Sequence, residues 1–206
     1  MPRLLARHSA AERSNHWAVA LLFVLAALSG LAFFHPALYG LTVLFGGGPW
    51  ARILHPFFGV VMALLFVAMF LRYWRDNLVG EVDRAWRANM GTLLRGGESG
   101  MPPAGKYNYG QKLVFWSMTV SLLVLLVTGI VFWRPWFAYS FPIGLVRLAT
   151  LLHAIAAFVL VLTLIVHVYA AIWVKGTIRG MTRGTVTEGW AARNHTLWHR
   201  EVTGGR

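Results

Sequence analysis

The sequence predicts an all-α integral membrane protein, a four-transmembrane-helix up-and-down bundle with both termini in the cytoplasm. Hydrophobic residues make up 57% of the 206 residues and charged residues only 13%, whereas soluble domains carry about 25% charged residues. Four apolar stretches are each long enough to cross a bilayer, which takes about 20 helical residues. The sequence has no cysteine, which excludes thiolate-held iron–sulfur clusters and zinc sites within it.

The predicted spans cover residues 17–34, 53–71, 113–133 and 146–174 of a single membrane domain, 1–206. None of them contains an acidic residue or a lysine. A loop at 76–112 and a tail at 175–206 make up most of the remaining chain. Short connections between the other spans favour antiparallel neighbours packed as one bundle.

The basic residues predict the orientation of these spans. Sixteen of the 19 lysines and arginines lie in the N-terminal tail, in the segment between the second and third spans, or in the C-terminal tail. Because cytoplasmic loops carry the excess of Lys and Arg, both termini and the 76–112 loop are expected in the cytoplasm. The loops at 35–51 and 134–145 are expected outside.

Four of the eight histidines lie in or at the ends of apolar spans: His16, His55, His153 and His167. An ionisable residue inside a membrane is costly, and it marks a functional site by default. A single histidine could equally be a core residue bonded to a neighbouring helix, but four at paired depths favour a function. The others are expected in solvated tails or loops: His8, His35, His195 and His199.

The depths of the four histidines form two pairs. His153 and His167 are fourteen residues apart on one span, which corresponds to about 21 Å of rise with both side chains on nearly the same face. His55 matches the outer depth of His153, and His16 matches the cytoplasmic depth of His167. Two imidazoles at one depth can fill both axial positions of a haem iron, which then transfers electrons. Without a C-x-x-C-H motif such haems are non-covalent, so the pattern predicts two haems b.

Several segments in order resemble the gamma subunit, or cytochrome b subunit, of membrane-bound formate dehydrogenases. The resemblance extends from about residue 11 to residue 201. The matching segments are Arg13-Ser14-Asn15-His16-Trp17, Arg52-Ile53-Leu54-His55-Pro56-Phe57-Phe58-Gly59, Gly105-Lys106-Tyr107-Asn108-Tyr109-Gly110-Gln111-Lys112, Phe132-Trp133-Arg134-Pro135, Leu151-Leu152-His153-Ala154, His167-Val168-Tyr169 and Trp173-Val174-Lys175-Gly176.

The resemblance implies a place for the chain in a respiratory complex of the bacterial inner membrane. A molybdopterin or tungstopterin alpha subunit would oxidise formate, so this chain would contain no formate-oxidising site. An iron–sulfur beta subunit would pass electrons to the outer haem, on His55 and His153. The cytoplasmic haem, on His16 and His167, would deliver them to menaquinone or ubiquinone. Asn108, Gly110 and Gln111 would help to bind that quinone.

Two features of the sequence leave other interpretations open. Asn-x-Gly is a common turn, and Gln111 could cap a helix instead of binding a quinone. Pro56 disfavours helical geometry at the residue before it, which predicts that His55 lies at a helix start or a kink. His35 also lies on the outer side, but its place before Pro36 and beyond the apolar run argues against a ligand role.

Three rival functions remain. The histidine spacing alone would also suit the two-haem subunit of a nickel–iron hydrogenase or a thiosulfate reductase. A haem-free transporter whose histidines relay protons is a further class. That class usually adds buried acids to the relay, and the predicted spans contain none. The long motifs therefore favour formate dehydrogenase.

Overall fold

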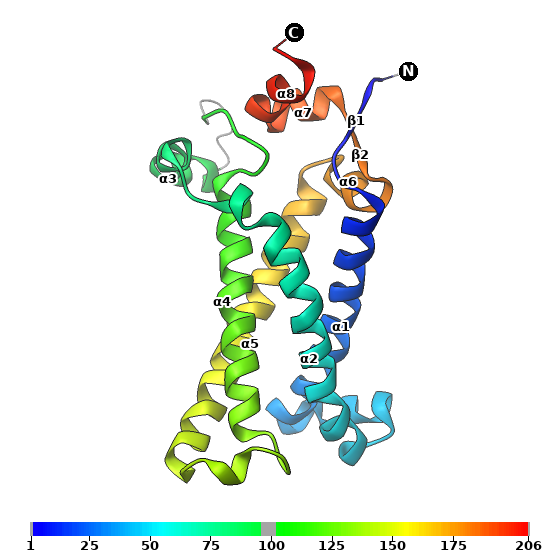
Figure 1. The fold of residues 1–206 in the computed structure, drawn as a ribbon, viewed down its shortest axis with the longest axis vertical. Helices are drawn as coiled ribbons and strands as arrows, with labels where there is room; N and C mark the ends of the chain where they lie inside the picture. The colour runs from blue at the N-terminus through cyan, green and yellow to red at the C-terminus, as the bar shows by residue number, and fades with distance from the viewer. Residues whose placement is uncertain (1, 96–101, 206) are drawn as a thin grey trace. The chain divides into compact units, whose positions relative to one another are not determined.

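A computed structural model describes residues 2–95 and 102–205, and it is almost entirely helical. Four long helices are apolar enough to cross a membrane: α1 (Ala10–Phe34), α2 (Gly48–Tyr73), α4 (Tyr109–Phe132) and α5 (Ile143–Trp173). These helices confirm the predicted all-α membrane fold (Figure 1). Each of the first three begins four to seven residues before its predicted span.

The chain divides into two compact units. One, which we call the helical unit, comprises residues 14–71 and 117–164, and the other, the terminal unit, comprises residues 1–13, 72–116 and 165–206. Segments of all four long helices form the core of the helical unit, around Met62, Phe66, Leu122 and Leu160. Large apolar side chains such as Leu64, Leu123 and Phe158 point outward and are more than half exposed. An exposed apolar wall of this kind suits lipid as its solvent.

Proline and glycine define the start of α2. A 3₁₀ helix (Pro36–Phe45) ends at Gly46, whose φ of 86° favours glycine. Helix α2 then begins at Gly48 with Pro49 in its first turn, where the missing N–H costs nothing. Of the helix start and the kink predicted at His55, the helix start is excluded, because α2 begins seven residues earlier and continues through Pro56.

The second pair of long helices has a similar short connection. Helix α4 ends at Phe132, and a 3₁₀ turn (Ala138–Ser140) leads to α5 at Ile143. Ser117 on α4 and Thr163 on α5 are joined by a hydroxyl–hydroxyl hydrogen bond of 2.7 Å within the helical unit. Polar contacts of this kind between apolar helices help to fix their register.

Both polar tails belong to a folded part of the terminal unit. Strand β1 (Leu4–Ala6) pairs antiparallel with β2 (Thr185–Thr187), with Leu5 opposite Val186. Three short helices complete this part: α6 (Thr177–Arg183), α7 (Glu188–Asn194) and α8 (Thr196–Thr203). Val186, Ala191 and Trp198 form its core. The tails had been expected to be solvated, and this expectation was wrong for His195, which is 1% exposed.

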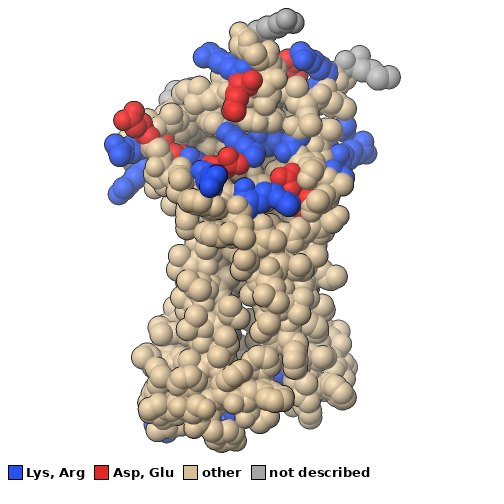
Figure 2. Space-filling model, in the orientation of Figure 1, with Lys and Arg blue, Asp and Glu red and all other residues tan. Residues whose placement is uncertain are grey.

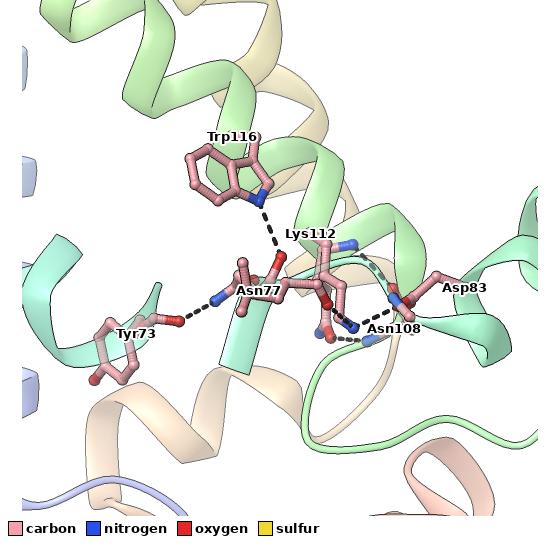
Figure 3. Close-up of polar contacts among 9 residues, drawn as sticks. Tyr73, Asn77, Asp83, Asn108, Lys112 and Trp116 are labelled. Carbon is pink, nitrogen blue, oxygen red and sulfur yellow. Dashed lines mark hydrogen bonds and ion pairs between the residues drawn. The ribbon is translucent and has the colours of Figure 1, made fainter. Parts of the chain in front are cut away.

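Helix α3 (Glu81–Leu94) is attached to the start of α4 within the terminal unit. Lys112 forms a 2.7 Å ion pair with the buried Asp83 and also donates to the Leu78 carbonyl. The Trp116 indole donates to the Asn77 carbonyl at 2.9 Å, as Figure 3 shows. Charged side chains gather over the loops and short helices of the terminal unit, whereas the wall of the helical unit shows few (Figure 2).

Candidate functional site

His55 and His153 face each other inside the helical unit. His55 lies on α2 and His153 on α5, and their ring centroids are 6.2 Å apart with an interplanar angle of 68°. Metal–imidazole bonds of about 2.0 Å place two imidazole centroids on opposite sides of one metal roughly 6 Å apart. The structure thus brings together two of the residues predicted as ligands, at a separation that fits a shared iron.

The neighbouring helix α1 contacts the His55 ring. Nδ1 of His55 lies 3.0 Å from the Ser29 hydroxyl and 3.1 Å from the Ala26 carbonyl oxygen. Ser29 is completely buried, and its hydroxyl also donates to the Leu25 carbonyl of its own helix at 2.7 Å. The ring is therefore held through Nδ1, while Nε2 has no part in these bonds.

Helix α4 contacts the His153 ring in the same manner. Nδ1 of His153 lies 3.0 Å from the Thr128 hydroxyl, which itself donates to the Val124 carbonyl at 2.6 Å. Phe132, one turn further along α4, packs edge-to-face against the ring with centroids 5.0 Å apart. Both histidines are thus oriented by a hydroxyl on the helix that precedes their own in the chain.

Glycine follows each of these hydroxyl residues. A Cβ at Gly30 would lie 2.9 Å from Cε1 of His55, closer than real Cβ contacts come, and a Cβ at Gly129 would lie 3.3 Å from Cε1 of His153. The glycines therefore let the rings approach the backbone of α1 and α4. The structure thus places each of these two small residues against an imidazole.

The residues present fit a haem. The imidazoles of His55 and His153, on separate helices, would hold the iron of a haem, which would supply a one-electron carrier. Hydrogen bonds from Nδ1 to oxygen atoms are the usual companions of a metal-ligating histidine. Sequence reasoning missed Ser29 and Thr128. The available signal was a hydroxyl–glycine dipeptide 25 or 26 residues before a histidine, found once in each half of the chain.

The second predicted pair, His16 and His167, is divided between the two units and stays a prediction. His16 lies on α1, and its ring packs edge-to-face against Trp17 with centroids 5.2 Å apart. His167 lies on α5, the same continuous helix as His153. His35 is the N-cap of the 3₁₀ helix, where its Nδ1 accepts from the Ala37 N–H at 3.2 Å.

The segment predicted to bind quinone begins helix α4. The Asn108 N–H donates to Gln111 Oε1 at 3.0 Å, and the Gln111 N–H donates to Asn108 Oδ1 at 2.9 Å. This reciprocal arrangement is a capping box, so the helix-cap interpretation of Gln111 is confirmed. Gly110 lies in the first turn of α4, where backbone N–H groups have no acceptor within the helix.

The loop before α4 is attached to both ends of the chain. Nδ1 of His195 contacts the Gly105 carbonyl at 2.8 Å, and the Leu197 N–H donates to the Ala104 carbonyl at 3.0 Å. The Arg7 guanidinium donates to the Lys106 carbonyl and lies 4.2 Å from the centroid of the Trp198 ring. The terminal segments therefore fix the loop that leads into the predicted quinone residues.

Burial changes the acidity of the groups around this loop. Desolvation, together with the nearby Arg7 charge, lowers the pKa of His195 to about 4. Desolvation also lowers the pKa of Arg7, against the opposing effect of Tyr107. The pKa of the Tyr107 hydroxyl is raised, mainly by its burial. His195 is therefore neutral at physiological pH.

A bundle of four membrane-spanning helices with two facing, oxygen-supported imidazoles defines a membrane protein of the haem-binding class. Comparison with known proteins gives the family: residues 7–184 match the prokaryotic cytochrome b561 family. The chain belongs to this family, and the family implies that it binds haem b.

Curated relatives cover nearly the whole chain. The formate dehydrogenase cytochrome b556(fdo) subunit of Escherichia coli K12 is 47% identical over 198 residues, which are 96% of this chain and 93% of that protein. The nitrate-inducible cytochrome b556(Fdn) subunit of the same strain is 42% identical over 97% of this chain and 92% of its own. The formate dehydrogenase cytochrome b556 subunit of Haemophilus influenzae is 40% identical over 95% and 82%. These relatives confirm the resemblance expected from the motifs, and the chain is a multi-pass protein of the bacterial inner membrane.

Proposed function

We propose that this chain is the dihaem cytochrome b subunit of a formate dehydrogenase complex. It accepts electrons from an iron–sulfur subunit on the outer side of the membrane and delivers them to a quinone on the cytoplasmic side. A molybdopterin or tungstopterin subunit oxidises the formate. The names of the relatives support the complex, and the observation that carries the electron-transfer role is the 6.2 Å separation of the His55 and His153 rings.

Four histidines hold the two haems in this proposal. His55 and His153 hold the outer one, and His16 and His167 hold the cytoplasmic one. A haem with an imidazole on each side supplies a one-electron carrier with no open coordination position. Helix α5 contributes a ligand to each pair, because His153 and His167 are separated by about 21 Å of helix rise.

The quinone binds next to the start of α4. The capping box uses the side-chain oxygens of Asn108 and Gln111, which leaves their amide nitrogens as donors for a quinone carbonyl. The Gly110 N–H in the first helical turn is a third donor. Lys112, in the same turn, forms an ion pair with Asp83 beside this segment.

Histidine variants test the haem assignment. The purified protein is expected to contain two haems b per chain. His55→Ala and His153→Ala should remove the same haem, and His16→Ala and His167→Ala should remove the other, as seen by haem content and redox titration. His35→Ala is the matched control, because it removes an outer-side histidine that caps a 3₁₀ helix. Two haems retained in His55→Ala, or a colourless wild-type protein, would reject the assignment.

The donor of the electrons distinguishes the rival complexes. In intact membranes the haems should be reduced on addition of formate. Reduction by hydrogen and not by formate would instead assign the chain to a hydrogenase. Oxidation of pre-reduced haems by thiosulfate would assign it to a thiosulfate reductase. Blocking quinone reduction should leave both haems reduced under formate, because electrons then have no exit.

A further inference from the structure

The two outer histidines are supported by matching sets of groups. Ser29 contacts Nδ1 of His55 across 26 residues, and Thr128 contacts Nδ1 of His153 across 25, both at 3.0 Å. Each hydroxyl is followed by the glycine that lies against the same ring. A hydroxyl on each of two helices thus contacts the same ring atom of its histidine at the same distance.

The hydrogen-bond inventory determines which ring nitrogen carries the proton. A hydroxyl has one proton to donate, and Thr128 donates it to the Val124 carbonyl at 2.6 Å. The contact with His153 must then be accepted by the Thr128 oxygen, so Nδ1 of His153 is the donor. On the other helix, the Ser29 hydroxyl donates to the Leu25 carbonyl. The Ala26 carbonyl, 3.1 Å from Nδ1 of His55, can only accept, so Nδ1 of His55 carries a proton as well.

We infer that Ser29 and Thr128 are positioning residues that hold His55 and His153 in the Nδ1–H form, with both Nε2 lone pairs directed to one iron. This inference rests on the proposed function, because it needs the outer haem to be held by this pair. The oxygen acceptors also make each imidazole more electron-donating, which favours ferric over ferrous iron. The two hydroxyls thereby lower the midpoint potential of the outer haem.

A purely structural role for the two hydroxyls predicts a different result for the haem. Ser and Thr in membrane helices commonly satisfy their hydroxyls with the carbonyl four residues earlier, and both residues do so here. If that were their whole role, removing the hydroxyl would leave the haem unchanged. A readout of the haem itself therefore separates the two interpretations.

The test uses Thr128→Val, which keeps the shape of the side chain and removes the acceptor. We expect this variant to retain the outer haem with a raised midpoint potential, where a tenfold change in the ferric-to-ferrous affinity ratio corresponds to about 59 mV. Haem loss from the outer site should be about 10–100-fold faster, as for other supporting partners of metal ligands. Ser29→Ala should shift the same haem in the same direction.

Two matched variants complete the experiment. Thr128→Ser restores the hydroxyl and should return the potential to the wild-type value. Thr150→Val removes an exposed hydroxyl of α5 that bonds only the Val146 carbonyl, and it should change nothing. Loss of the outer haem in Thr128→Val, with rescue by Thr128→Ser, would also support the inference, because the hydroxyl would then be needed to hold the ligand. If Thr128→Val and Ser29→Ala both keep the outer haem at its wild-type midpoint potential, the inference is overturned. If His153→Ala retains two haems, the proposed function is overturned.

Discussion

Asn108 and Gln111 cap each other across the first turn of α4, through reciprocal hydrogen bonds of 3.0 and 2.9 Å. The side-chain oxygens therefore have a structural role, and any role in quinone binding falls to the amide nitrogens. Substitutions that keep the oxygen and remove the nitrogen can separate the two roles.

Asn108→Asp and Gln111→Glu are expected to keep the helix start and weaken quinone reduction. Asp and Glu are good residues for the two positions of a capping box, so thermal stability should change little. Loss of one neutral hydrogen bond costs about 1 kcal/mol, so quinol formation should slow several-fold in a steady-state assay. Asn108→Ala is the control that removes the cap, at about 1 kcal/mol of stability. Wild-type quinone reduction in both conservative variants would contradict the proposed site.

Gly30→Ala should displace the His55 ring. The new Cβ would lie 2.9 Å from Cε1 of His55. Because the backbone of α1 is fixed by its own helical hydrogen bonds, the ring must move. Gly129→Ala, with a contact of 3.3 Å, should be milder, and Gly144→Ala, which meets nothing within 4 Å, is the control. Outer-haem content should fall in the order Gly144→Ala, Gly129→Ala, Gly30→Ala. Equal haem content in all three would show that these rings are not held against α1 and α4.

Asp83→Ala should strongly destabilise the terminal unit. The Asp83 and Lys112 side chains are 5% and 12% exposed, and removing one partner of a buried pair costs about 3–5 kcal/mol. The Asp76–Lys106 pair has the same 2.6–2.7 Å geometry with 37% and 35% exposure, so Asp76→Ala should cost about 1 kcal/mol or less. Thermal melting of both variants in detergent compares them. A similar decrease in melting temperature in the two variants would show that burial does not make the Asp83–Lys112 pair more stabilising than the exposed pair.

The terminal unit should lose stability between pH 6.5 and pH 4. The pKa of His195 is lowered to about 4 by burial and by Arg7, whereas an unfolded histidine has a pKa of about 6.5. In this window the unfolded chain binds a proton that the folded chain does not, so stability is complete above the window and falls as the pH drops. The slope approaches 1.4 kcal/mol per pH unit.

Amide hydrogen exchange of the β1–β2 pair at pH 7 and pH 5, corrected for intrinsic rates, measures this loss. His195→Gln cannot titrate and should remove most of the pH dependence. If the stability of His195→Gln depends on pH as strongly as that of the wild type, other titrating groups cause the pH dependence.

Much of the membrane fold was predictable because lipid imposes strict conditions on a sequence. A span must be apolar over about 20 residues and must satisfy its own backbone, so the four long helices could be located without coordinates. The terminal unit could not be predicted in the same way. His195 stands in a polar segment, and only the packing of Trp190 and the Gly105 carbonyl around it explains its burial.

The sequence by itself determined the four membrane spans and the family, because these follow from local composition and motif order. Only the tertiary structure decided that His55 and His153 face each other and that Ser29 and Thr128 support them. A serine or threonine in an apolar helix can satisfy its hydroxyl within that helix. Its contact with a histidine 25 or 26 residues away exists only once neighbouring helices have packed side by side.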